Sequence, residues 1–132
     1  MKAVVVDDSR IVRERVTEML LDLTRIEDIA QAVDGQNAME VITQVKPDLV
    51  VLDIHMPRAD GKRADNGMDV LKLIKAGANP PIVIMLSNFG EPQYRARCKQ
   101  LGADAFLDKS NEVFQLVAIA AALLNLRRES LA

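Results

Sequence analysis

The chain of 132 residues suits one compact domain, and 49% hydrophobic with 27% charged residues is the composition of an ordinary globular protein. A net charge of −2 and an aromatic content of 3% argue against nucleic acid as a partner, because phosphate binding needs a basic surface and base stacking needs aromatic rings. The sequence has one cysteine, which cannot form an internal disulfide. It has no apolar stretch long enough for a membrane span or a signal peptide. We therefore expect one cytoplasmic domain over residues 1–132, with no membrane partner.

Five short apolar segments predict the strands of a sheet. They are residues 3–6 (AVVV), 29–33 (IAQAV), 49–52 (LVVL), 82–86 (IVIML) and 105–107 (AFL). Four are almost continuously apolar, which is typical of parallel strands that are covered on both faces. The second carries the polar Gln31 and is a candidate edge strand.

The segments between these strands have the spacing of amphipathic helices. The apolar stripes of four helices are Ile11, Val12, Val16, Met19, Leu20 and Leu23; Ala38, Val41, Ile42 and Val45; Met68, Leu71 and Ile74; and Tyr94, Cys98 and Leu101. The last helix, over about residues 111–128, is apolar around most of its circumference, which predicts a contact surface in addition to the core face. Because strands and helices alternate five times, we expect a doubly wound, parallel α/β sheet with five helices on both faces.

Polar side chains stand where the predicted strands end, which is where doubly wound folds place their functional sites. Asp7 and Asp8 follow the first strand, Asp53 the third, Ser87 the fourth and Lys109 the fifth. Carboxylates that share a small pocket raise one another's pKa unless a cation neutralises them, and Mg²⁺ prefers such oxygen ligands. The sequence offers no His/Cys cluster for zinc. Carboxylates, a lysine and a hydroxyl around a metal are typical of a phosphoryl-transfer site.

These residues resemble the receiver domain of two-component response regulators. The matching motifs are the acidic pair in VVVDDSR, the acid in LVVLDIHMP, the serine that ends IVIMLS and the lysine in LGADAFLDKS, in the family's order. The resemblance implies a flavodoxin-like sheet of five strands in the order 2-1-3-4-5. It also implies a stand-alone signalling domain, similar to chemotaxis regulators, that receives a phosphoryl group from a sensor histidine kinase or a phosphotransfer protein.

The resemblance also implies a phosphoacceptor and a set of metal ligands. Asp53 would accept the phosphoryl group on its carboxylate. Asp8, the Asp53 carboxylate and the backbone carbonyl of His55 would bind Mg²⁺, and Asp7 would assist through water.

Three further roles follow from the same resemblance. Lys109 would pair with the phosphoryl oxygens, and the Ser87 hydroxyl would donate a hydrogen bond to one of them. Phe106 matches a switch position whose ring turns inward when Ser87 moves towards the phosphate. The surface that changes would be formed by the fourth helix, the fifth strand and the fifth helix, and it would bind a downstream target protein or a second copy of the chain.

Plainer roles are open for several of these residues. Asp7, Asp8 or Ser9 could cap the first helix, because acids and hydroxyls are favoured at helix N-termini. Phe106 could simply pack in the core. We expect the ring of His55 to face solvent.

Three features depart from the family pattern. Ser110 follows Lys109 where most members have proline, often after a cis peptide bond, so a trans bond here could hold the lysine less firmly. Asn88 follows Ser87 where a smaller residue is usual, which predicts slower hydrolysis of the phosphate. The loop RADGKRADNG at residues 58–67 is longer than usual, and it is either a plain surface loop or a lid or partner contact.

Two other functions fit parts of the pattern. A Mg²⁺-dependent phosphohydrolase on a similar sheet also uses an aspartate nucleophile, but it needs a second acid two residues later, where this chain has His55. A phosphorylation-independent adaptor would keep the fold and bind through the last helix alone. We expect a signalling domain rather than an enzyme, with Mg²⁺-dependent self-phosphorylation and slow self-dephosphorylation at Asp53.

Overall fold

The computed structural model describes residues 1–57, 63–64, 66–88 and 92–131. Its main sheet has five parallel strands: β1 (Lys2–Val6), β2 (Asp28–Ala32), β3 (Leu49–Asp53), β6 (Ile82–Ser87) and β7 (Ala105–Asp108). Their spatial order is β2-β1-β3-β6-β7, which confirms the predicted order 2-1-3-4-5 and places the strand with Gln31 at an edge.

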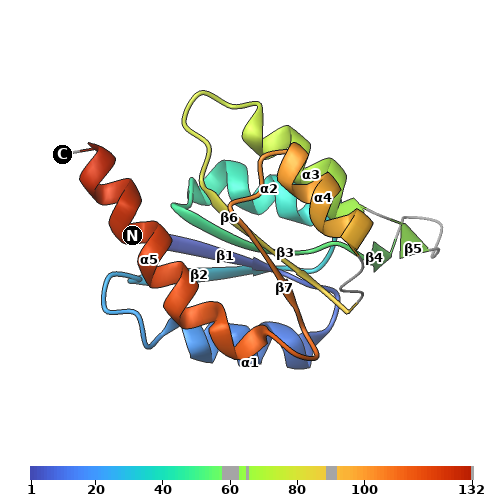
Figure 1. Cartoon of the computed structure of the whole chain (residues 1–132), viewed down its shortest axis with the longest axis horizontal. Helices are drawn as coiled ribbons and strands as arrows, with labels where there is room; N and C mark the ends of the chain where they lie inside the picture. Colours follow the sequence, from blue (N-terminus) through green and yellow to red (C-terminus); the bar gives the residue numbers. More distant parts are fainter. Residues whose placement is uncertain (58–62, 65, 89–91, 132) are drawn as a thin grey trace.

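Helices cover both faces of this sheet, as predicted (Figure 1). One face is covered by α1 (Arg10–Leu20) and α5 (Leu116–Leu131), and the other by α2 (Gly35–Val45), α3 (Asn66–Lys75) and α4 (Pro92–Gln100). Alternate strand residues point to opposite faces, so Val4 and Val6 join one core while Ala3 and Val5 join the other. This double coverage is why four of the strands read as continuous apolar runs.

A second, two-stranded antiparallel sheet follows β3, formed by β4 (Met56–Pro57) and β5 (Arg63–Ala64). The long loop of residues 58–67 begins directly after β4, and β5 lies within it. Most of that loop lies outside the described residues, so its role as a lid or partner contact stays a prediction. Within the described part of the chain, no helix has both the length and the apolar character needed to cross a membrane.

The first helix differs from its predicted stripe at one end. Val16 and Leu20 are buried as expected, but the side chain of Ile11 is 74% exposed. The buried face runs through residues 12, 16 and 20, whereas a helix places residue 11 on the flank that it shares with Arg15 and Glu18. The prediction for Ile11 was therefore wrong.

The last helix begins later than predicted. Residues 109–112 form a turn, a short 3₁₀ helix η1 (Val113–Gln115) follows, and α5 starts at Leu116. The backbone N–H of Glu112 donates to the carbonyl of Asp108, and the Glu112 carboxylate accepts from the Asp108 N–H. These bonds hold the chain in a turn where apolar spacing alone predicted helix.

Gly67 fixes the approach of α3 to the end of β3. Its backbone N–H donates to the carbonyl of Ile54 at 3.0 Å. A Cβ atom at this position would lie 2.1 Å from the backbone oxygen of Asp53, which is closer than any real contact. Glycine is therefore the residue that lets the helix pack directly against the strand end that carries Asp53.

Candidate functional site: an acidic pocket at the strand ends

Strand register brings the predicted site residues together. Val6 pairs with Leu52, which places Asp7 beside Asp53 at the ends of neighbouring strands. On the other side Asp53 pairs with Leu86, so Ser87 follows directly, and Ser87 in turn pairs with Asp108, the residue before Lys109. The register thus brings these residues together at the carboxyl ends of β1, β3, β6 and β7, and their roles there stay predictions.

The three acids are close enough to share one cation. One carboxylate oxygen from each of Asp7, Asp8 and Asp53 lies within 4.8 Å of the other two. Ligands of Mg²⁺ lie about 2.1 Å from the ion, so two ligands on opposite sides are about 4.2 Å apart. A small movement, or a water molecule in place of one direct bond, fits this oxygen cluster to Mg²⁺.

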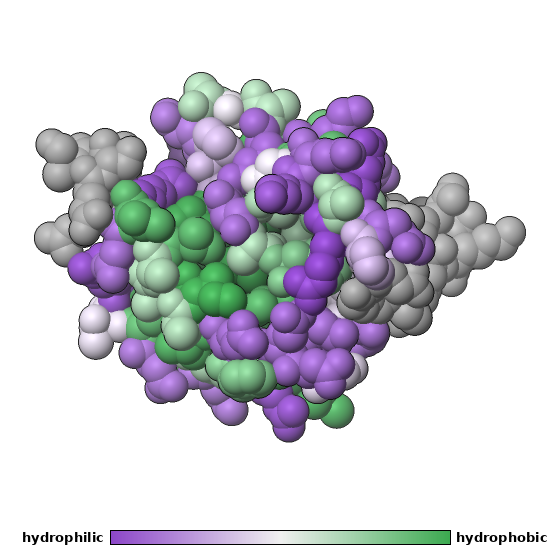
Figure 2. All heavy atoms as spheres, viewed as in Figure 1, coloured by the Kyte–Doolittle hydropathy of each residue, from purple (hydrophilic) through white to green (hydrophobic). Residues whose placement is uncertain are grey.

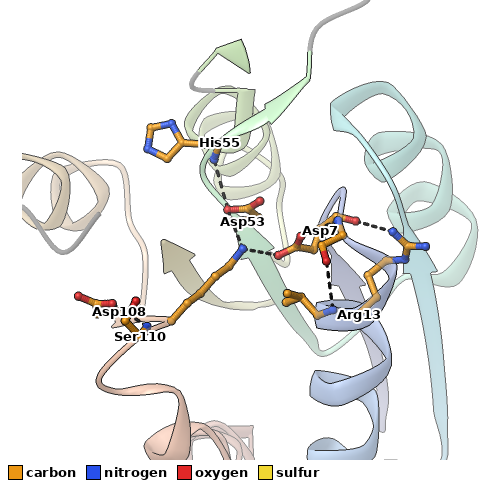
Figure 3. Close-up of polar contacts among 9 residues, drawn as sticks. Asp7, Arg13, Asp53, His55, Asp108 and Ser110 are labelled. Atoms are coloured by element: carbon orange, nitrogen blue, oxygen red, sulfur yellow. Dashed lines mark hydrogen bonds and ion pairs between the residues drawn. The ribbon is translucent and has the colours of Figure 1, made fainter. Parts of the chain in front are cut away.

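Lys109 lies against two of these acids. Its ammonium nitrogen is 2.5 Å from Oδ2 of Asp7 and 3.3 Å from Oδ1 of Asp53, and its side chain is 11% exposed (Figure 3). The three carboxylates of the cluster and this one ammonium group together carry an excess of two negative charges when all are ionised, which matches the charge of a divalent ion.

Asp7 is held firmly in its buried position. Its Oδ1 atom accepts the backbone N–H of Ser9 at 2.9 Å, and its backbone oxygen accepts the guanidinium of Arg13 at 2.9 Å (Figure 3). Its Oδ2 atom accepts a hydrogen bond from the ammonium group of Lys109, so both carboxylate oxygens of Asp7 accept hydrogen bonds. The helix cap is supplied instead by Ser9, whose hydroxyl accepts the N–H of Val12.

The surroundings of Asp53 favour its protonated form when no metal is bound. Burial raises the pKa of Asp53, and the charge of Asp7 raises it further, while Lys109 lowers it; the result is a pKa of about 7 instead of 3.8. The side chain is almost fully buried. Its Oδ1 atom also accepts the backbone N–H of His55 at 3.3 Å.

The His55 ring departs from its prediction. Its Nε2 atom is buried, and the ring lies edge-on to Tyr94 of α4 with 5.2 Å between centroids. The expectation that the ring faces solvent was wrong, because α4 supplies an aromatic neighbour.

Ser87 and Phe106, the predicted switch residues, lie on the neighbouring strands β6 and β7. Ser87 is fully buried at the end of β6, and its backbone oxygen accepts the N–H of Lys109 at 2.8 Å. Phe106 is half-buried and packs against the core, and the guanidinium of Arg95 lies 4.8 Å from the centre of its ring. Phe106 thus packs against the core, and its role as a switch residue stays a prediction.

Sequence reasoning missed the contribution of Arg13. Its guanidinium spans from the backbone oxygen of Asp7 to the side chain of Gln31 on the edge strand. A bond to a backbone carbonyl leaves no residue-type pattern, so nothing in the sequence singles Arg13 out from the other basic residues of the first helix.

The comparisons with known proteins agree with this geometry. The family model of the response regulator receiver domain matches residues 3–121. The chain is 36% identical over 108 residues to protein-glutamate methylesterase/protein-glutamine glutaminase 3 of Geobacter sulfurreducens, covering 82% of this chain and 27% of that protein. It is 39% identical over 113 residues to the corresponding enzyme of Idiomarina loihiensis, covering 84% of this chain and 28% of that protein. The chain thus spans less than a third of the length of these relatives.

Solved structures show the same fold. The response regulator domain of CheB from Thermotoga maritima has a TM-score of 0.74 and 29% identity, covering 98% of this chain and 94% of that one. The signal receiver domain of the putative response regulator NarL from Mycobacterium tuberculosis has a TM-score of 0.77 and 29% identity, covering 96% and 95%. With the acidic pocket of Asp7, Asp8 and Asp53 at the strand ends, these matches show that the chain belongs to the response regulator receiver domain family of two-component signalling.

Proposed function

We propose that this receiver domain accepts a phosphoryl group on Asp53 from the phosphohistidine of a sensor kinase or a phosphotransfer protein. In that step a carboxylate oxygen of Asp53 forms a bond to phosphorus, and the bond between phosphorus and the donor nitrogen breaks. The observation that carries the proposal is the position of the Lys109 ammonium group against both Asp7 and Asp53 in a buried acidic pocket. A buried strand aims the nucleophile, so little orientation has to be gained during transfer.

The pocket also supports a Mg²⁺ site. Asp8, Asp53 and the backbone carbonyl of His55 would be the direct ligands, and bound Mg²⁺ would neutralise charge on the phosphoryl oxygens. An indirect role through water suits Asp7, because both of its carboxylate oxygens already accept hydrogen bonds, from Ser9 and Lys109.

Two other side chains would contact the transferred group. Lys109 would move its ammonium group from the carboxylates to the phosphoryl oxygens, which carry more negative charge. Ser87 would donate its hydroxyl hydrogen to one of these oxygens, and Phe106 would turn inward as Ser87 moves. This change would alter the surface formed by α4, β7 and α5.

The same surface supports a protein partner. Apolar side chains gather over α5 (Figure 2), and they include Leu126, which is 62% exposed, and the half-buried Ile119 and Leu123. A downstream target or a second copy of the chain would cover this surface more tightly after phosphorylation. Light scattering over a dilution series, with and without beryllofluoride as a phosphoryl mimic, would count against self-association if the protein stayed a monomer throughout.

This function is that of a cytoplasmic signal carrier rather than an enzyme with an external substrate. We do not propose the methylesterase and glutaminase activities in the relatives' names for this chain, because the match covers less than a third of those proteins. The hydrolase alternative is weakened by His55, whose ring packs against Tyr94 at the position where a second acid is needed.

The direct test is incubation with acetyl phosphate and Mg²⁺ followed by intact-mass spectrometry. We expect the mass of one phosphoryl group to appear on the natural protein, to require Mg²⁺, and to be absent from Asp53→Asn. Rapid turnover of the donor without a lasting adduct would favour a phosphohydrolase. Unchanged signalling in cells that carry Asp53→Asn would favour the adaptor.

A further inference from the structure

The residue that follows Lys109 in this chain is Ser110, and the peptide bond between them is trans. Hydrogen bonds hold the turn that carries the lysine. The backbone N–H of Lys109 donates to the carbonyl of Ser87 at 2.8 Å. The N–H of Ser110 donates to Oδ1 of Asp108 at 2.8 Å. The N–H of Glu112 donates to the backbone carbonyl of Asp108, also at 2.8 Å. Figure 3 shows Asp108 and Ser110 at the base of the lysine side chain.

Glu112 closes this turn from its other end. Its Oε1 atom accepts the backbone N–H of Asp108 at 3.0 Å, so the carboxylate is bonded to the main chain one residue before Lys109. The pKa of Glu112 is lowered, first by this backbone hydrogen bond and then by Arg95. The ionised carboxylate is thus the form that the turn stabilises.

Arg95 fixes Glu112 from a different part of the fold. The guanidinium forms an ion pair with the same Oε1 atom, donates to the backbone oxygen of Phe106 at 3.1 Å, and lies over the ring of Phe106. Its planar group has donors on several sides, which allows one side chain to hold α4, β7 and the turn together. An isolated surface ion pair contributes little to stability. In this pair, however, the Glu112 carboxylate also accepts the backbone N–H of Asp108, the residue before Lys109.

We propose that Glu112 is a positioning residue for Lys109 and that Arg95, from α4, acts through it. The Arg95–Glu112 pair, which we call the brace, holds the turn so that the ammonium group reaches Asp7 and Asp53. This inference rests on the proposed function, because it assigns to the brace an effect on phosphoryl transfer at Asp53. It also gives α4 a physical connection to the phosphoryl-transfer site.

The first test measures the environment of the Lys109 ammonium group directly and does not depend on phosphorylation. In the metal-free protein, the ¹⁵N and ¹³Cε NMR signals of the Lys109 ammonium group are assigned with Lys109→Arg. We expect Glu112→Ala and Arg95→Ala to shift or broaden these signals. The matched control is Glu14→Ala, which removes the carboxylate of another arginine pair, Arg10–Glu14 at 2.9 Å, on α1. It should leave the Lys109 signals unchanged.

The second test reads the reaction. Because a displacement of about 1 Å costs up to about a hundredfold in rate, we expect Glu112→Ala to slow phosphorylation by acetyl phosphate about tenfold. Glu112→Gln, which keeps the acceptor for the Asp108 N–H, should recover part of the rate. If Arg95 acts through Glu112, the double variant should be no slower than Glu112→Ala alone.

Each contrary outcome has a distinct meaning. Unchanged Lys109 signals in folded Glu112→Ala would overturn the brace, even if the rate fell. Additive losses in the double variant would overturn the connection from Arg95. If the natural protein took up no phosphoryl group, the proposed function would fail, while the NMR comparison would still decide whether the brace positions Lys109.

Discussion

Replacing Asp53 with asparagine should make the metal-free protein more stable, by an amount that grows with pH. The carboxyl group is almost fully buried, and its pKa is raised to about 7, whereas in an unfolded chain it is about 3.9. The folded protein therefore binds this proton more tightly than the unfolded chain does. The resulting stability is fully present below about pH 4 and is lost as the pH rises through about 7.

The size of the effect follows from the two pKa values. Each unit of difference corresponds to about 1.4 kcal/mol, so ionised Asp53 costs the folded state up to about 4 kcal/mol above pH 7. Between pH 5 and pH 8 the contribution of Asp53 to the free energy of unfolding falls by about 2 to 3 kcal/mol. Asp53→Asn removes this term, so its free energy of unfolding should exceed that of the natural protein by a margin that increases over this range.

Urea denaturation in the presence of EDTA at pH 5, 6, 7 and 8 measures this margin. Asp22→Asn is the matched control, because it removes one carboxylate of the same charge from an exposed turn. Adding Mg²⁺ at pH 8 should stabilise the natural protein more than Asp53→Asn, which lacks one of the ligands. A margin that is constant from pH 5 to pH 8, or that shrinks, would refute the reasoning.

Three further predictions concern the geometry around this site. Gly67→Ala should lower the free energy of unfolding, measured by urea denaturation, by about 2 kcal/mol or more, because its Cβ would overlap the backbone of Asp53. Gly77→Ala, whose Cβ would have its nearest contact at 3.4 Å, should have little effect. Equal losses in the two variants would contradict this account. Asp8→Ala should weaken Mg²⁺ binding about tenfold or more in calorimetric titration without unfolding the protein, and an unchanged affinity would exclude Asp8 as a ligand. The thiol of Cys98 is fully buried, so it should react with Ellman's reagent only as fast as the protein unfolds, and fast reaction in native buffer would contradict its burial.

The arrangement of the sheet and its site could be predicted because both follow from short-range sequence patterns. Continuous apolar runs mark strands buried on both faces, and parallel strands bring their carboxyl ends to one edge. Asp7, Asp53 and Lys109 are therefore close in space although they are far apart in the sequence. The structure places the Lys109 ammonium within 3.3 Å of both acids.

The remaining features depend on contacts between distant segments that leave no periodic signal. Ile11 has the residue type of a core position, but the helix turns it away from the sheet. The sequence predicts a helix from about residue 111, yet a side-chain hydrogen bond of Glu112 holds a turn there. The environment of the His55 ring is set by Tyr94 on α4, which no local pattern around residue 55 reveals.

The most direct test of the central claim, that Asp53 forms an acyl phosphate in this acidic pocket, is chemical trapping. The protein is incubated with a phosphodonor and Mg²⁺ and then reduced with borohydride, which converts an aspartyl phosphate to homoserine. We expect peptide mass spectrometry to find homoserine at residue 53, and at residue 53 alone. A phosphoryl group on another residue, or no homoserine at residue 53 when the phosphoryl mass is present, would contradict the account.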